Sequence, residues 1–169
     1  INDNVGIPII IYNIPSRSVI DMNVDTMAKL YELKNIKGVK DATGDLKRVD
    51  QQIKAMGKEF IQLTGNDDNA LEFNKRGGVG AIGVTANVAA KLSSEFQKAC
   101  LTDMNKALEL DKQLQPLHTS LFIESNPSPV KYAASLLGMC KPDVRLPLVE
   151  IREDTKNKVS EALKVAKLL

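Results

Sequence analysis

Four short apolar segments alternate with four amphipathic segments over the first hundred residues, and this alternation constrains the fold more than any other feature. The apolar segments comprise residues 8–12, 36–40, 60–63 and 79–84. Their length, their content and the Gly, Pro or Asn residues beside them are typical of buried parallel strands. The amphipathic segments have apolar residues at helical spacing and cover residues 23–33, 46–56, 69–75 and 88–101. Such alternation predicts parallel βα units.

The rest of the chain has a different pattern. No convincing strand follows Asp103, and helices are expected over residues 103–121, 130–137 and 155–168. Four βα units make up half of an eight-stranded barrel. We therefore predict an α/β fold in which residues 1–101 form the C-terminal half of a (β/α)8 TIM barrel and residues 102–169 form a helical C-terminal region. The alternation by itself leaves a small, open, doubly wound sheet as an alternative.

Composition excludes several classes of function. Hydrophobic residues make up 43% of the chain and charged residues 26%, the formal net charge is +2, and the basic residues are scattered among acidic ones. This pattern predicts a globular protein that binds no nucleic acid. The longest apolar run, residues 9–12, is too short to cross a membrane. Cys100 and Cys140 lack metal-ligand spacing, so we expect reduced thiols, no metal site and a cytoplasmic location. The sequence begins with Ile1 and reads as part of a longer protein.

In a βα barrel, functional residues lie where strands end and βα loops begin. Lys40 ends the second apolar segment and is followed by the sequence DATG. An amine at the barrel mouth is shielded from water, which favours its nucleophilic form. The alternative is an ordinary lysine whose ammonium extends into solvent. Lys37 has similar neighbours and no strand-end position, so it serves as the natural control.

Tyr12 and Arg17 follow the first apolar segment. A phenol at Tyr12 can relay protons among barrel-mouth groups, and a guanidinium at Arg17 can bind a substrate carboxylate through two hydrogen bonds. The alternatives are a rim aromatic with a hydrated hydroxyl and a solvated loop arginine. The glycine-rich residues 77–83 lack the Walker lysine and the GxGxxG spacing, so close backbone packing beside a ligand is the better interpretation.

Two further features are interpreted as structural. Asp67 and Asp68 form a potential carboxylate pair, but they have no acidic or histidine companion. Their position before the third helical segment instead favours a capping role. His118 stands alone in a helical segment, so we interpret it as a packing or surface residue and not as a ligand.

Five motifs together carry a resemblance to a known family. The chain is similar to the dihydrodipicolinate synthase family from about Pro8 to Leu169, which is nearly its whole length. The wider group of pyruvate-dependent aldolases, which includes N-acetylneuraminate lyase, shares the tyrosine and the strand-end lysine. The PSR loop and the VTANVAA run indicate the synthase branch. The motifs are IYNIPSR (11–17), GVKDATG (38–44), LTGNDD (63–68), VTANVAA (84–90) and NPSPVK (126–131).

The resemblance implies an activity and a role for each candidate residue. Lys40 would form an imine with pyruvate, so no cofactor is expected, and Tyr12 would donate and accept protons. Arg17 would bind the carboxylate of aspartate semialdehyde, and Gly65 and Ile82 would line the pyruvate end of the site. The implied reaction condenses the two substrates on the route to diaminopimelate and lysine, in a homotetramer.

The chain departs from the family pattern in two ways. Ser18 and Val19 stand where the family usually has Thr-Gly after the arginine. The family's Gly-Thr-Thr-Gly-Glu loop and second relay tyrosine belong to the first half of the barrel and are not in this sequence. We therefore expect residues 1–169 alone to be inactive. Two rival interpretations remain: an aldolase acting on N-acetylneuraminate or keto-sugar acids, and an inactive truncated remnant.

Overall fold

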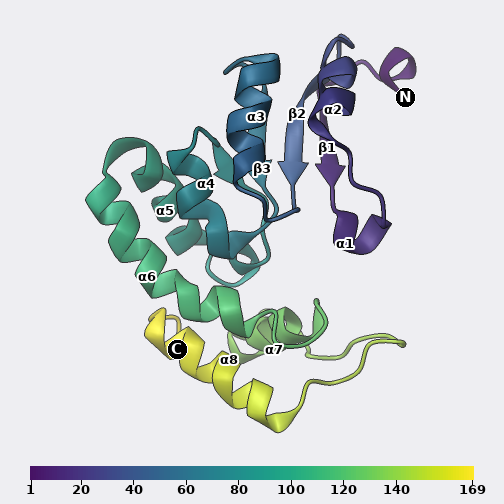
Figure 1. Ribbon diagram of the computed structural model, residues 1–169. Coiled ribbons are helices and arrows are strands. Elements are labelled where there is room, and N and C mark those ends of the chain that lie inside the picture. Colours follow the sequence, from purple (N-terminus) through teal and green to yellow (C-terminus); the bar gives the residue numbers. More distant parts are fainter. The chain divides into compact units, whose positions relative to one another are not determined.

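The computed structural model describes all of residues 1–169 and contains two compact units, Ile1–Gly83 and Val84–Leu169. The first unit holds the sheet (Figure 1) and the second holds the C-terminal helices. The helix that follows the fourth strand lies in the second unit. The assignment of residues 1–101 to the barrel and 102–169 to a separate region therefore stays a prediction.

The first unit is built on a four-stranded parallel sheet. Its strands are β1 (Ile9–Asn13), β2 (Ile36–Asp41), β3 (Ile61–Thr64) and β4 (Gly80–Ala81). Every neighbouring pair is parallel, and the spatial order is β1-β2-β3-β4. A doubly wound sheet reverses its strand order at a switch point and carries helices on both faces. The sequential order is instead that of a barrel segment, so the doubly wound alternative is wrong.

β4 is shorter than the predicted strand over residues 79–84. Only Gly80 and Ala81 have strand geometry. The backbone N–H groups of Val79 and Ile82 still donate to carbonyls of β3, each at 2.9 Å. The pairing with β3 therefore extends one residue beyond β4 at each end.

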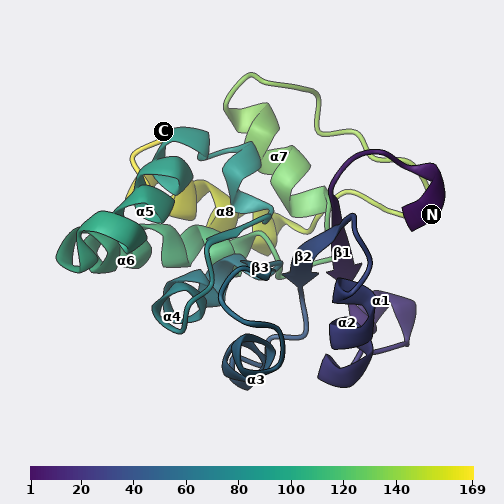
Figure 2. The ribbon, with the colours of Figure 1, turned by 90° about the horizontal axis from the view of Figure 1, so that it is seen from above.

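Helices of the first unit follow their strands as predicted, with small shifts at the ends. They are α2 (Val24–Tyr31), α3 (Lys47–Met56) and α4 (Ala70–Lys75), the last preceded by the 3₁₀ turn η2 (Asp67–Asn69). All three lie on the same side of the sheet (Figure 2). Two short elements were not predicted: η1 (Asn2–Asn4) and α1 (Pro15–Ser18), which directly follows β1.

Side-chain hydrogen bonds stabilise the starts of two of these helices. The side chain of Asn23 accepts a hydrogen bond from the backbone N–H of Thr26 at 2.8 Å, at the start of α2. Asp45 accepts from the backbone N–H of Lys47 at 3.0 Å, at the start of α3. Each side chain satisfies a backbone donor that has no partner within its helix.

The core of this unit lies between the sheet and the helices. Met27 of α2, Val39 of β2 and Phe60 before β3 are fully or almost fully buried there. The ring of Tyr31 meets that of Phe60 edge-to-face, with centroids 5.0 Å apart. Val39 and its register partner Ile11 thus face the helices, which leaves the next residue of each strand to face the other way.

The second unit contains helices and no strands. It contains η3 (Thr85–Asn87), α5 (Ala90–Thr102), α6 (Met104–Ser120), α7 (Ser128–Leu136) and α8 (Glu153–Val165). α8 packs on α6 and α7, and α5 packs on α6. The core consists of fully buried leucines and valine: Leu114, Leu117, Leu121, Val159 and Leu163. The predicted helices are confirmed. As predicted, no strand follows Asp103.

Two polar contacts fix these helices. His118 is buried, and its Nδ1 lies 2.8 Å from the hydroxyl of Thr85, so of the two predicted roles, packing and surface, it has the packing role. Glu124 caps α8 from a distant point in the sequence by accepting from the backbone N–H of Arg152 at 3.0 Å. The neighbouring Thr155 side chain and then this backbone bond hold the pKa of Glu124 below its usual value.

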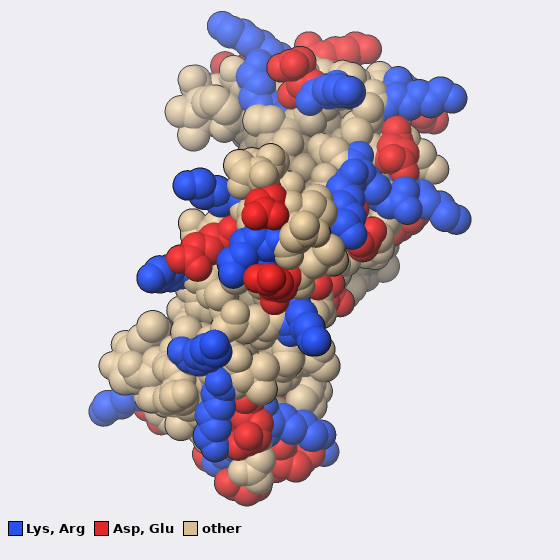
Figure 3. Space-filling model, turned by 90° about the vertical axis from the view of Figure 1, so that its left-hand side faces the viewer, with Lys and Arg blue, Asp and Glu red and all other residues tan.

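Charges of both signs are mixed on the surface, as they are along the sequence. On the face drawn in Figure 3, Lys and Arg side chains intermingle with Asp and Glu, and apolar or neutral surface separates them. No helix is both long and apolar enough to cross a membrane. No group of three or more His, Cys, Asp or Glu side chains is arranged to hold a metal ion.

Candidate active site

Lys40 and Tyr12 lie side by side at the carboxyl ends of neighbouring strands. They are register partners in the parallel ladder between β2 and β1. The Nζ atom of Lys40 lies 3.9 Å from the centroid of the Tyr12 ring, which is within the range of a cation–π contact. Tyr12 is 49% exposed and Lys40 is partly buried, so both side chains are accessible from solvent. The two residues predicted to carry the chemistry are therefore in contact.

Lys40 and Lys37 occupy different places in β2. Val39 and Asp41, the neighbours of Lys40 in β2, are buried on the helix-covered side of the sheet. Lys40 therefore projects from the opposite side. Lys37 is exposed and lies close to the other end of the strand, where the register with β1 shifts. The control lysine has neither the strand-end position nor the tyrosine neighbour.

Gly65 forms part of the wall around the Lys40 side chain. Its backbone N–H donates to the carbonyl of Asp41 at 2.6 Å, which draws the end of β3 against the end of β2. A Cβ atom at position 65 would lie 3.2 Å from Cε of Lys40 and 2.8 Å from Cβ of Ala42. A glycine is needed here because both distances are shorter than an ordinary carbon–carbon contact.

Ile82 and Arg17 lie at other strand ends. Ile82 follows β4, is 46% exposed, and donates its backbone N–H to Thr64. Arg17 is exposed in α1, immediately after β1. The structure thus places both residues at the same carboxyl edge of the sheet as Lys40. Neither side chain contacts Lys40 in the way that Tyr12 does.

The departure from the family pattern at Val19 has a structural consequence. Val19 ends α1 with φ at 64°, in the left-handed region, and its N–H donates to the carbonyl of Pro15. That conformation suits glycine and disfavours a β-branched residue. The backbone after Arg17 therefore keeps a glycine-type turn although the residue is valine.

The glycine-rich run packs closely, as predicted. A side chain at Gly78 would overlap the ring of Phe73, and one at Gly83 would overlap the carboxylate of Asp67. Asp67 is buried in η2. Its carboxylate therefore lies against the backbone that follows Ile82, a contact that the capping interpretation did not include.

The polar groups on the other side of the sheet were not predicted from the sequence. Arg48, in the first turn of α3, is 8% exposed and forms an ion pair with the buried carboxylate of Asp41. In the sequence, the only indication is a charged residue on the otherwise buried side of an amphipathic helix, seven residues after the Asp that follows Lys40.

The chain is similar to known proteins of one family. Residues 1–166 match the model of the dihydrodipicolinate synthetase family. The chain is 69% identical to the 4-hydroxy-tetrahydrodipicolinate synthase of Pelagibacter ubique and 59% identical to that of Methylobacterium radiotolerans. Both matches include the whole of this chain, which spans 59% and 57% of the length of these two relatives.

Solved structures give the same result. Dihydrodipicolinate synthase from Aquifex aeolicus superposes with a TM-score of 0.94 at 41% identity, over 99% of this chain and 58% of that one. The chloride-inhibited enzyme from Acinetobacter baumannii, complexed with pyruvate, superposes with a TM-score of 0.93 at 38% identity, over the same shares. The α/β fold is a partial TIM barrel followed by helices, and the chain belongs to the dihydrodipicolinate synthetase family.

Proposed function

We propose that the full-length protein condenses pyruvate with L-aspartate 4-semialdehyde, with Lys40 as the residue that forms a Schiff base with pyruvate. The observation that carries this proposal is the contact between Lys40 Nζ and the Tyr12 ring at the carboxyl edge of a parallel sheet. An amine nucleophile beside a phenol is the pair that imine chemistry requires, because each step moves a proton.

The relatives support the same reaction. The two curated relatives described above are named as 4-hydroxy-tetrahydrodipicolinate synthases, and one similar solved structure is a complex with pyruvate. Because this chain spans less than two thirds of those relatives, the activity is proposed for the longer protein to which the chain corresponds. It would serve diaminopimelate and lysine biosynthesis.

The proposed chemistry begins at the nitrogen of Lys40. The neutral amine adds to the keto carbon of pyruvate, and loss of water gives an imine. Once protonated, the imine withdraws electrons, so the methyl group of pyruvate loses a proton and becomes an enamine carbon. This carbon attacks the aldehyde of the second substrate, whose oxygen takes up a proton. Attack by the substrate's amine on the imine carbon then closes the ring and releases Lys40.

Tyr12 is proposed to carry the protons in these steps. Its ring lies next to the lysine nitrogen, so its hydroxyl belongs to the same small region as the reacting carbon. No separate cofactor is needed, because the imine is itself the electron sink. Gly65 would leave room for the imine at the pyruvate end, and the backbone at Ile82 would line the same end.

Arg17 is proposed to bind the carboxylate of the semialdehyde. It is an exposed cation on α1, at the same edge of the sheet as Lys40 and one short turn from Tyr12. A guanidinium binds a carboxylate through two parallel hydrogen bonds, which fixes the orientation of the aldehyde as well as its affinity.

A keto-sugar-acid or N-acetylneuraminate aldolase would use the same lysine and tyrosine. The synthase is preferred because the relatives with the highest identities described above carry that name. The protein is further proposed to act in the cytoplasm as a homotetramer, in keeping with the resemblance to the family. An inactive remnant is the remaining alternative, and the experiment below distinguishes it.

The test uses the full-length protein with ¹³C-labelled pyruvate and borohydride, which reduces an imine to a stable amine. We expect the added mass on Lys40, its loss in Lys40→Ala, and its retention in Lys37→Ala. Condensation is then measured with the semialdehyde, and cleavage with N-acetylneuraminate. A label on Lys37, or no label, would remove Lys40 from the mechanism. Label on Lys40 with turnover of the sugar acid alone would indicate the aldolase.

A further inference from the structure

A buried polar network lies directly behind the Lys40–Tyr12 pair. Asn13 and Asp41 immediately follow Tyr12 and Lys40 in the two strands and are only 3% and 5% exposed. Because side chains alternate along a strand, they project to the helix-covered side of the sheet. Each residue of the reacting pair therefore has a buried polar neighbour one position later.

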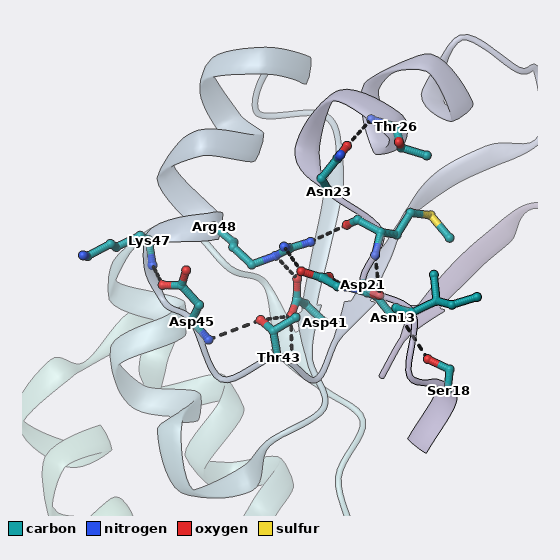
Figure 4. Close-up of polar contacts among 12 residues, drawn as sticks. Asn13, Ser18, Asp21, Asn23, Thr26, Asp41, Thr43, Asp45, Lys47 and Arg48 are labelled. Carbon is teal, nitrogen blue, oxygen red and sulfur yellow. Dashed lines mark hydrogen bonds and ion pairs between the residues drawn. The ribbon is translucent and has the colours of Figure 1, made fainter. Parts of the chain in front are cut away.

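Arg48 connects this side of β2 to the segment before α2. Its Nε donates to Asp41 at 3.0 Å, and one terminal nitrogen donates to Asp21 at 3.1 Å. The other terminal nitrogen donates to the backbone carbonyl of Met22 at 2.6 Å. Figure 4 shows the guanidinium between these three acceptors. All three of its nitrogens are used, so the planar group is held in one orientation.

The second half of the network reaches β1. The Asn13 amide donates to Asp21 at 2.9 Å and accepts from the backbone N–H of Met22 at 3.2 Å. The carbonyl of Asn13 also accepts from the backbone N–H of Ala42, at 2.9 Å. A continuous path thus runs from Asn13 through Asp21 and Arg48 to Asp41 (Figure 4).

Asp41 is fixed on its other oxygen as well. Its Oδ1 accepts from the backbone N–H of Thr43 at 2.8 Å and from the hydroxyl of Thr43 at 2.6 Å. Its Oδ2 is paired with Arg48. A carboxylate held by three donors cannot rotate without breaking charge-assisted hydrogen bonds. The residue after Lys40 is therefore anchored from two directions.

We propose that Arg48 is a positioning residue that sets the distance between Lys40 and Tyr12. This inference rests on the proposed function, in which those two side chains exchange protons. Arg48 touches neither substrate nor the reacting atoms, and it acts through Asp41 on β2 and through Asp21 and Asn13 on β1. Small errors in the relative position of reacting groups lower the rate of the chemical step more than they lower binding.

The simpler interpretation is that the network only holds the fold together. The two interpretations predict different results in variants that still fold. If the network is only structural, loss of Arg48 lowers the melting temperature and leaves kcat unchanged in the folded enzyme. If Arg48 positions the pair, kcat is reduced even at temperatures well below the melting temperature, while the KM for pyruvate changes little.

The test compares Arg48→Lys and Arg48→Met in the full-length enzyme. The matched control is Arg76→Met, because Arg76 also pairs with an aspartate, Asp50 at 2.7 Å, but on an exposed surface. We expect kcat to fall by about tenfold in Arg48→Lys, which keeps one charge, and by about a hundredfold in Arg48→Met. The KM for pyruvate should stay within about threefold of wild type, and the control should be unchanged.

Asp21→Ala provides a second test of the proposal if the Arg48 variants do not fold. The Asp21 side chain is 49% exposed, and its removal breaks the side-chain path to Asn13, leaves the link through the Met22 backbone and keeps Arg48 paired with Asp41. We expect a loss in kcat with the borohydride label on Lys40 retained. Wild-type kcat in the folded variants would overturn the proposal. Absence of label on Lys40 in the wild type would overturn the proposed function itself, together with this inference.

Discussion

Gly65→Ala tests the site by filling space beside the reacting lysine. The new Cβ would lie 3.2 Å from Cε of Lys40 and 2.8 Å from Cβ of Ala42, whereas relaxed carbon contacts are about 3.5–4.0 Å. The lysine must therefore move by several tenths of an ångström, and the end of β3 must move by close to 1 Å. Overpacking of this kind costs about 1–3 kcal/mol of stability.

The larger effect is expected on catalysis. A misplacement of about 1 Å can cost roughly a hundredfold in rate, so we expect kcat/KM to fall by about that factor. The assay is steady-state condensation by the full-length enzyme, together with the rate of borohydride labelling of Lys40. Gly6→Ala is the control, because nothing lies within 4 Å of a Cβ at that position. Wild-type labelling and turnover in Gly65→Ala would show that Gly65 does not form the wall around Lys40.

Two further variants address the turn after β1. Arg17→Ala should lower kcat/KM for the semialdehyde by about tenfold to a hundredfold, the worth of a charge-assisted hydrogen bond, and should leave pyruvate labelling intact. Equal loss of both would mean that Arg17 is structural. Val19→Gly should relieve about 1–2 kcal/mol of left-handed strain and should cost about 0.5–1 kcal/mol in backbone entropy. We therefore expect the free energy of unfolding, measured by urea titration, to rise by roughly 0.5–1 kcal/mol. A lower urea midpoint would show that the valine is not strained.

Sequence patterns gave the order of elements because each strand and helix here is a local periodicity. Short apolar runs and helical spacing predicted all four strands and the main helices. The length of the fourth strand was overestimated because its apolar run contains glycines, which weaken a strand. α1 was missed because four residues beginning with Pro15 are too few to show a helical period.

Part of the candidate site could likewise be predicted from the sequence, and part could not. Lys40 and Tyr12 were found because strand ends are visible in a sequence, and the structure then placed them in contact. The contact itself depends on strand register, which no local pattern specifies. Arg48 was missed because its importance comes from partners that are distant in the sequence, such as Asp21 at a separation of 27 residues. A buried arginine in an amphipathic helix looks like any other charged residue until the fold is known.

Adjacent residues at the ends of β1 and β2 have different roles on the two faces of the sheet. In each of β1 and β2, the penultimate residue faces the open side and the last residue is anchored on the helix side. A shift of register by one residue would exchange these roles and bury Lys40 among the helices. Pairing of Asp41 with Arg48 opposes such a shift, since an aspartate moved to the open side would leave a buried guanidinium without its partner. The same ion pair that would set the spacing of Lys40 and Tyr12 therefore also specifies which face Lys40 occupies.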